Sequence, residues 1–176
     1  SVYLVADSEF RMDNLITFKT SDYSEGIDVF ESCYRHMSTN TPEFEKICIR
    51  RWFILRNFLR NQNIESCYYS DSDVMIYDNV SKIYENYKQY DAAYTLPKDQ
   101  ENYRWSASAC CSYWKQRTLD KFCGFILDIY NSHSALLETK WMHQLQNNIP
   151  GGICDMTLLY LFSEKISFTS LSREKN

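Results

Sequence analysis

The sequence predicts an α/β domain whose mainly parallel sheet is covered by helices on both faces. Short apolar runs of strand length alternate with longer amphipathic segments of helical period. Hydrophobic residues make up 44% of the 176 residues and aromatic residues 16%, so the chain can build a core and disorder is excluded. Only four glycines and three prolines interrupt it, and no repeat or low-complexity linker is present. Residues 1–176 are therefore expected to form one domain.

The predicted strands are apolar runs that end at polar or turn residues, and they cover 2–6, 15–18, 66–70, 92–96 and 166–169. The predicted helices cover 27–36, 41–61, 80–90, 118–130, 135–146 and 155–162. The segment 98–114 shows no clear period and is expected to form a loop over a site. Thr118 and Asp155 are expected to cap the helices that they begin.

The helix from residue 41 has the clearest signals. Thr41 can cap its amino end, and Pro42 fits the first turn because the missing N–H is not needed there. Apolar side chains then recur at helical spacing and predict one buried face. That face comprises Phe44, Cys48, Trp52, Leu55 and Leu59.

Charge and composition limit the partners. The net charge is −4 and the basic residues form no stripe, which excludes sequence-independent nucleic-acid binding. An acidic protein can still bind an anionic nucleotide through a bridging divalent cation.

Cysteine usage points to a reducing compartment. Seven cysteines are present, an odd number without a C-x-x-C pair, so neither a zinc knuckle nor a redox motif is supported. No apolar run is long enough for a transmembrane segment. The expected location is the cytoplasm, with peripheral attachment to the inner membrane as the alternative.

The acidic triplet Asp71-Ser72-Asp73 directly follows a predicted strand. Two aspartates two residues apart on an extended chain share one face, and their repulsion is relieved by a cation. Carboxylate oxygens suit Mg²⁺ or Mn²⁺. Asp7 follows the first strand in the same way, and ligands of α/β sheets bind outside the carboxyl ends of strands. The alternative for Asp7 and for the triplet is an ordinary turn.

The chain resembles glycosyltransferases of the GT-A fold, in particular bacterial nucleotide-diphospho-sugar transferases. The segment 34–77 carries the resemblance best. It holds a His-x-Ser-x-Asn segment at 36–40, a Phe-Glu…Arg-Trp-Phe helix at 44–53 and Asp-Ser-Asp-Val at 71–74. Looser similarity covers 112–114, 119–125 and 152–157. The resemblance implies a Rossmann-like, GT-A type sheet that binds a nucleotide sugar.

The resemblance also implies roles. Asp71 and Asp73 would hold Mn²⁺ or Mg²⁺ against the diphosphate of a nucleoside-diphosphate sugar, with a UDP-sugar as the first guess. Ser72 would lie against the ribose or sugar of the donor, and Asp7 would face the nucleobase. The acceptor would be a hydroxyl of a glycan or of a lipid-linked molecule.

Two further positions are candidates on the same grounds. Of Arg50 and Arg51, Arg51 is favoured for reaching the donor phosphates or bracing the aspartates. Asp155, after the Gly151-Gly152 turn, would contact the transferred sugar or the acceptor hydroxyl, and in an inverting enzyme it would be the general base. A helix cap is the other interpretation of Asp155.

Two features of the GT-A pattern are missing, and two rivals remain. That fold usually begins with a strand before Val2 and often takes a third metal ligand near the carboxyl end. Neither is evident, so two interpretations stay open: the metal is held by the aspartates, phosphates and water alone, or the chain is a fragment that lacks terminal elements. The rivals are a phosphatase of the haloacid dehalogenase type, with Asp71 as nucleophile, and a degenerate transferase that acts as a binding module. An EF-hand does not fit, because the required Gly and terminal Glu are absent.

Overall fold

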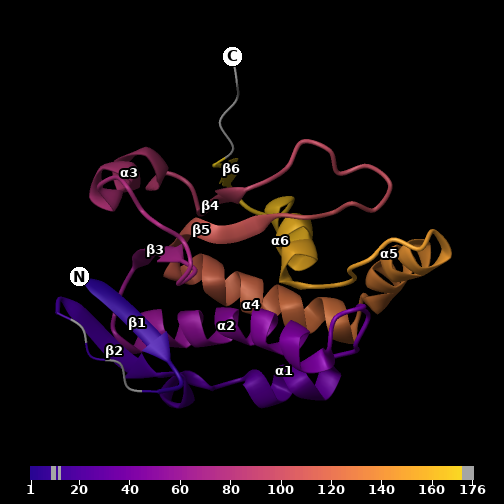
Figure 1. Ribbon diagram of the computed structural model, residues 1–176, viewed down its shortest axis with the longest axis horizontal. Coiled ribbons are helices and arrows are strands. Elements are labelled where there is room, and N and C mark those ends of the chain that lie inside the picture. Colours follow the sequence, from indigo (N-terminus) through magenta and orange to yellow (C-terminus); the bar gives the residue numbers. More distant parts are fainter. Residues whose placement is uncertain (9–10, 12, 172–176) are drawn as a thin grey trace.

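Two separate sheets organise this α/β fold (Figure 1). The computed structural model describes residues 1–8, 11 and 13–171. Its strands are β1 (Val2–Ala6), β2 (Leu15–Lys19), β3 (Ser66–Ser70), β4 (Ala92–Thr95), β5 (Ser108–Lys115) and β6 (Phe168–Ser170). Its helices are η1 (Thr20–Tyr23), α1 (Ile27–Cys33), α2 (Pro42–Asn61), α3 (Val80–Tyr87), α4 (Gln116–Asn131), α5 (Ser134–Gln146) and α6 (Asp155–Ser163).

The larger sheet is mixed, so the prediction of a mainly parallel Rossmann-like sheet needs correction. Its strand order is β3-β5-β4-β6. Strand β5 runs antiparallel to both neighbours, whereas β4 and β6 are parallel. The reason is β5 itself, which occupies 108–115 and so replaces the second half of the segment 98–114 that is predicted to be a loop. Strands β3, β4 and β6 nevertheless point the same way, so their carboxyl ends share one edge of the sheet.

The pleat of β5 sends successive aromatic side chains into two layers. Trp114 is fully buried and packs 5.3 Å from Trp52 of α2 and 5.8 Å from Phe122 of α4, measured between ring centroids. Tyr113 points to the opposite face, where its ring meets Tyr84 of α3 at 5.8 Å. Alternation of side chains along a strand explains why neighbours serve different layers.

Helix α2 forms where the sequence predicts it, but its buried face differs. The Thr41 hydroxyl accepts a hydrogen bond from the Phe44 N–H at 3.3 Å, as expected of the cap. Phe44 itself is 55% exposed, so its predicted burial is wrong. The buried face instead includes two polar residues, Glu45 and Asn57. A hydrophobic pattern cannot identify such positions, since their side chains are buried through hydrogen bonds.

The later helices lie close to their predicted positions. Thr118 is buried within α4, and Lys115 precedes the helix, so the predicted Thr118 cap is wrong. Asp155 is the first residue of α6, and Cys154 occupies the cap position of this helix, so Asp155 is not the cap. Across the described ranges, no helix combines the length and apolarity needed to cross a bilayer.

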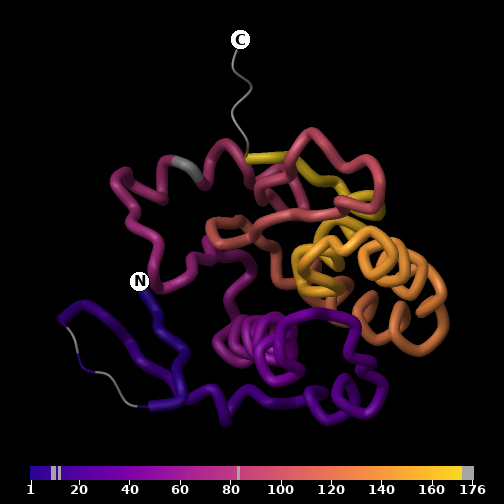
Figure 2. The backbone as a smooth tube through the Cα atoms, turned by 45° about the vertical axis from the view of Figure 1, so that its right-hand side comes forward, coloured from indigo at the N-terminus to yellow at the C-terminus, as the bar shows by residue number. Residues whose placement is uncertain are grey.

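The first two strands form their own sheet rather than extending the larger one. β1 and β2 pair in parallel, with Val2 opposite Leu15 and Ala6 opposite Lys19. Their aromatic side chains pack on Phe58 near the end of α2, with Tyr3 at 5.4 Å and Phe18 at 5.1 Å. In both views these strands lie at one end of the molecule and α5 at the other (Figures 1 and 2).

Candidate functional site

The acidic triplet lies at the shared carboxyl edge of the larger sheet. Asp71 follows β3, and its N–H donates to the Cys110 carbonyl of β5 at 2.9 Å. The chain then turns, because the Val74 N–H donates to the Asp71 carbonyl at 3.2 Å. Asp71 is therefore half-buried against the sheet, whereas Ser72 and Asp73 are exposed in the turn. The backbone leaves the extended conformation after Asp71, so strand alternation does not set how the two carboxylates point relative to each other.

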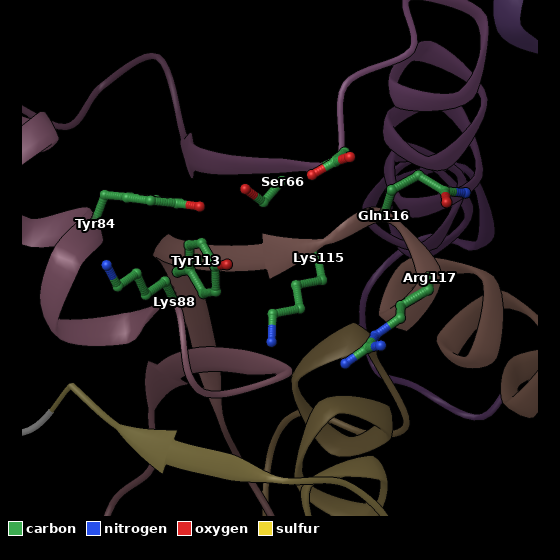
Figure 3. A pocket seen from close by; sticks show the side chains of 8 residues that line it. Ser66, Tyr84, Lys88, Tyr113, Lys115, Gln116 and Arg117 are labelled. Carbon is green, nitrogen blue, oxygen red and sulfur yellow. The ribbon is translucent and has the colours of Figure 1, made fainter.

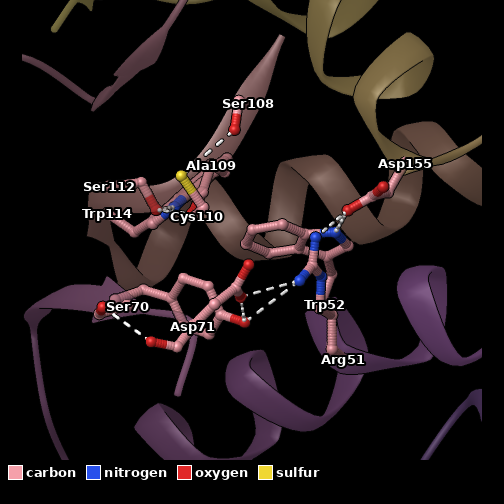
Figure 4. A network of polar contacts seen from close by, with 11 residues as sticks. Arg51, Trp52, Ser70, Asp71, Ser108, Ala109, Cys110, Ser112, Trp114 and Asp155 are labelled. Atoms are coloured by element: carbon pink, nitrogen blue, oxygen red, sulfur yellow. Dashed lines mark hydrogen bonds and ion pairs between the residues drawn. The ribbon is translucent and has the colours of Figure 1, made fainter. Parts of the chain in front are cut away.

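Arg51 of α2 joins two of the predicted site residues (Figure 4). Its Nη1 donates to Oδ1 of Asp71 at 2.9 Å, and its Nη2 forms an ion pair with Oδ2 of Asp155. Asp71 and Asp155 are 84 positions apart in the chain, and one guanidinium holds both. Arg50 instead pairs with Glu31 of α1. The structure thus places Arg51, and not Arg50, at the edge where Asp71 lies.

Two aromatic residues that sequence reasoning missed complete this cluster. The Tyr69 hydroxyl donates to Oδ1 of Asp71 at 2.6 Å, and the Trp52 indole N–H donates to Oδ2 of Asp155 at 3.2 Å. Tyr69 precedes Asp71 by two residues, and Trp52 is adjacent to Arg51. The first spacing could have been found in the sequence, because a strand places residues i and i−2, here Asp71 and Tyr69, on one side.

Close backbone packing places Asp155 beside α2. Gly152 pairs with Ser38 in an isolated antiparallel bridge, and the Ile153 N–H donates to the Met37 carbonyl at 2.7 Å. A Cβ at Gly152 would lie 2.3 Å from that carbonyl oxygen, so only glycine fits there. Buried Glu45 fixes the same segment by accepting the Ser38 hydroxyl at 2.6 Å. The turn before α6 is therefore tied to the start of α2, which brings Asp155 to Arg51.

The cluster keeps Arg51 positively charged. Burial lowers the pKa of the guanidinium, but the carboxylates of Asp155 and Asp71, together with Tyr69, outweigh this and raise it above its ordinary value. Burial raises the pKa of Tyr69, although Arg51 opposes that rise, so its hydroxyl remains a donor. The Asp155 side chain is only 4% exposed, whereas those of Arg51 and Asp71 are 28% exposed. The site is thus open to ligands on the Asp71 side.

The predicted metal ligands are the two aspartates of the triplet. Within the described residues, no group of three or more His, Cys, Asp or Glu side chains is placed to hold an ion. Asp71 already accepts two hydrogen bonds at Oδ1, and Asp73 is exposed. Two carboxylates suit Mg²⁺ or Mn²⁺, which retain water and take phosphate oxygens as further ligands.

Asp7 lies on the other sheet. It follows β1, and its carboxylate accepts a hydrogen bond from the hydroxyl of Thr20, which follows the paired strand β2. The expectation that Asp7 and Asp71 border one sheet edge is wrong, because β1 and β2 form a two-stranded sheet that is separate from the larger one among the described residues. The contact with Thr20 fits the alternative interpretation, in which Asp7 belongs to the turn at the strand end.

Comparisons with protein-family models, with curated proteins and with solved structures find no significant match.

Proposed function

We propose that this chain is a metal-dependent glycosyltransferase domain that binds a nucleoside-diphosphate sugar at the carboxyl edge of the larger sheet. The observation that carries the proposal is the Arg51 cluster, in which one permanently charged guanidinium holds Asp71 and Asp155. A cation and an acidic triplet at the carboxyl end of β3 favour an anionic ligand bridged by a metal. The resemblance of 34–77 to GT-A enzymes supports the same assignment.

The proposal gives each residue of the edge a task. Asp71 and Asp73 would hold Mn²⁺ or Mg²⁺, which when bound neutralises charge on the leaving nucleoside diphosphate. Arg51 lies beside Asp71 and retains a solvent-facing portion, so it can donate to a phosphate oxygen. Tyr69 orients the Asp71 carboxylate through its hydroxyl. Ser72, exposed in the turn, is free to contact the ribose or sugar.

Asp155 has contacts that favour a positioning role. Its Oδ2 accepts from both Arg51 and Trp52, and its side chain is almost fully buried. An acceptor hydroxyl would have to reach the other oxygen, Oδ1, of a side chain that is only 4% exposed. We therefore expect Asp155 to orient Arg51, and its use as general base stays a prediction.

Nucleotide binding measured by calorimetry tests the proposal. We expect UDP to bind with Mn²⁺ present and not in EDTA, and we expect Asp73→Asn to weaken binding by about tenfold or more, the loss of one charged ligand. Asp78→Asn is the matched control, because Asp78 is also exposed and lies just past the triplet. GDP is the second probe. Binding of neither nucleotide, or binding that is indifferent to Asp73→Asn, would refute the proposal.

The same preparation separates the two rivals. A phosphatase would hydrolyse p-nitrophenyl phosphate without binding UDP, whereas a degenerate transferase would bind UDP and transfer no sugar. Oδ1 of Asp71 accepts hydrogen bonds from Arg51 and Tyr69, which lowers its value as a nucleophile. Release of UDP from UDP-glucose or UDP-galactose, dependent on Mn²⁺, is the activity that we expect.

A further inference from the structure

A hollow that is open to solvent lies at the other end of β3 from Asp71. Its volume is about 400 Å³, and it lies where β3 begins and where β5 passes into α4, beside α3. Figure 3 shows Tyr84 of α3 and Lys88, which directly follows α3, on one side, and Lys115 and Arg117 from the junction of β5 and α4 on the other. Ser66 pairs with Lys115 across the two strands, so the register of the sheet fixes this part of the wall. A volume of this size matches a small-molecule site.

The wall of this cavity is cationic. Lys88, Lys115 and Arg117 line it together with one carboxylate, that of Glu65. Arg117 also pairs with Asp91 at 3.0 Å, and Lys88 pairs with Glu85. Lys115 is half-buried and makes no ion pair with any described residue. An anion bound in the cavity would pair with this ammonium group.

Two tyrosine rings in the wall give the cavity a surface on which a planar group can pack. The rings of Tyr84 and Tyr113 meet edge to face at 5.8 Å, and Tyr113 is only 2% exposed. Tyr84 is 42% exposed, so part of its ring stays available to a ligand. A planar group can pack against such a ring while an anionic group reaches the lysine.

We propose that this cavity binds a small phosphorylated ligand, with the phosphate on Lys115 and Arg117 and an attached ring against Tyr84. This site is distinct from the carboxyl edge that holds Asp71, because Ser66 and Ser70 are the two ends of β3. No metal is needed, since the wall itself supplies the positive charge. The proposal does not depend on the glycosyltransferase assignment.

Titration calorimetry in EDTA tests the proposal with phenyl phosphate, inorganic phosphate and benzoate as probes. EDTA removes any cation from Asp71 and Asp73, so the donor site takes no phosphate. We expect phenyl phosphate to bind more tightly than inorganic phosphate or benzoate, and Lys115→Gln to weaken it by about tenfold. Lys82→Gln is the matched control: it removes the same charge from an exposed position of α3 outside the cavity.

The outcomes separate this site from its rivals. Tyr84→Leu should weaken phenyl phosphate and leave inorganic phosphate unchanged, because only the former carries a ring. Equal losses in Lys115→Gln and Lys82→Gln would show a diffuse charge effect and overturn the proposal. Loss in Asp73→Asn under EDTA would place the ligand at the other edge, and binding of no probe would also overturn it. A preference for benzoate would identify a carboxylate site instead. Far-ultraviolet circular dichroism of each variant establishes that it is folded.

Discussion

The two ends of β3 differ in whether the charged side chains beside them form ion pairs. At the carboxyl end, Arg51 balances Asp71 and Asp155, and Trp52 and Tyr69 add hydrogen bonds. At the amino end, Lys115 borders a hollow and has no ion pair among the described residues. The charges at the first end are paired with each other, whereas Lys115 at the second end is not paired with any described residue. Removing one member of a buried ion-pair network lowers the free energy of unfolding strongly, whereas removing an unpaired, half-exposed charge changes it little.

Removing one cation from each end gives the largest expected contrast. Arg51→Met leaves the buried Asp155 carboxylate without its counter-charge, so we expect the free energy of unfolding to fall by about 3–5 kcal/mol. Lys115→Met breaks no ion pair, and we expect a change within about 0.5 kcal/mol. Urea denaturation measures both. Similar losses in the two variants would show that the ends do not differ in this way.

Alanine substitutions at two glycines are expected to change stability in opposite directions, because only one of the two glycines is in close backbone contact. Gly152→Ala forces a Cβ to within 2.3 Å of the Met37 carbonyl oxygen, and we expect a loss of about 1–3 kcal/mol. Gly124 lies in α4 with no atom within 4 Å of an added Cβ, so Gly124→Ala should stabilise by about 0.5–1 kcal/mol. Thermal unfolding of both variants checks the opposite signs. A gain in Gly152→Ala would mean that the turn before Asp155 shifts freely.

Lys140 is a buried lysine and contrasts with half-buried Lys115. It is 3% exposed and donates to the Trp105 carbonyl at 2.8 Å and to the Thr157 hydroxyl at 2.9 Å. Burial lowers the pKa of its ammonium group to about 8, although Cys154 opposes that fall. The unfolded chain, with an ordinary lysine pKa of about 10.4, therefore binds more protons above pH 8. Stability contributed at this position rises with pH through that window.

Comparison with Lys140→Met isolates this contribution, because the other titrating groups are common to both proteins. We expect the stability difference, wild type minus variant, to grow by about 1 kcal/mol between about pH 8 and 9. Urea midpoints at the two pH values measure it. A difference that stays constant, or that shrinks, contradicts a depressed Lys140 pKa.

Sequence reasoning located most elements because their signals are local. The Thr41-Pro42 cap, the break at 150–152 and the apolar runs each depend on a few neighbouring residues, and the structure has helices and strands at those places. Strand β5 was missed because its pattern mixes small, sulfur-containing and aromatic residues without clear alternation of polarity. The direction of β5 cannot be predicted locally, since it follows from pairing with β3 and β4.

The residues of the candidate site were predicted in part, because their local signals can be found in the sequence whereas their contacts cannot. Asp71, Arg51 and Asp155 were named from motif, helix and turn, and the structure brings these three together. Their connection through one guanidinium depends on the contact between Gly152 and Ser38, which joins segments far apart in the sequence. Asp7 was misplaced because the strand pattern of 2–6 does not specify which strand is its partner.

The placement of β5 between β3 and β4 also determines the order in which the carboxyl edge can form during synthesis. Residues 66–70 have no strand partner in the larger sheet until 111–115 have emerged from the ribosome, and the carbonyl that holds the Asp71 N–H belongs to Cys110. Asp155 follows later still, and the parallel partner of β4 comes last, at 168–170. Long-range pairing of this kind slows folding and leaves strand edges open in the nascent chain. The Arg51 cluster is therefore assembled late, and a chain that stalls before residue 155 presents Arg51 and Asp71 without the buried carboxylate that fixes them.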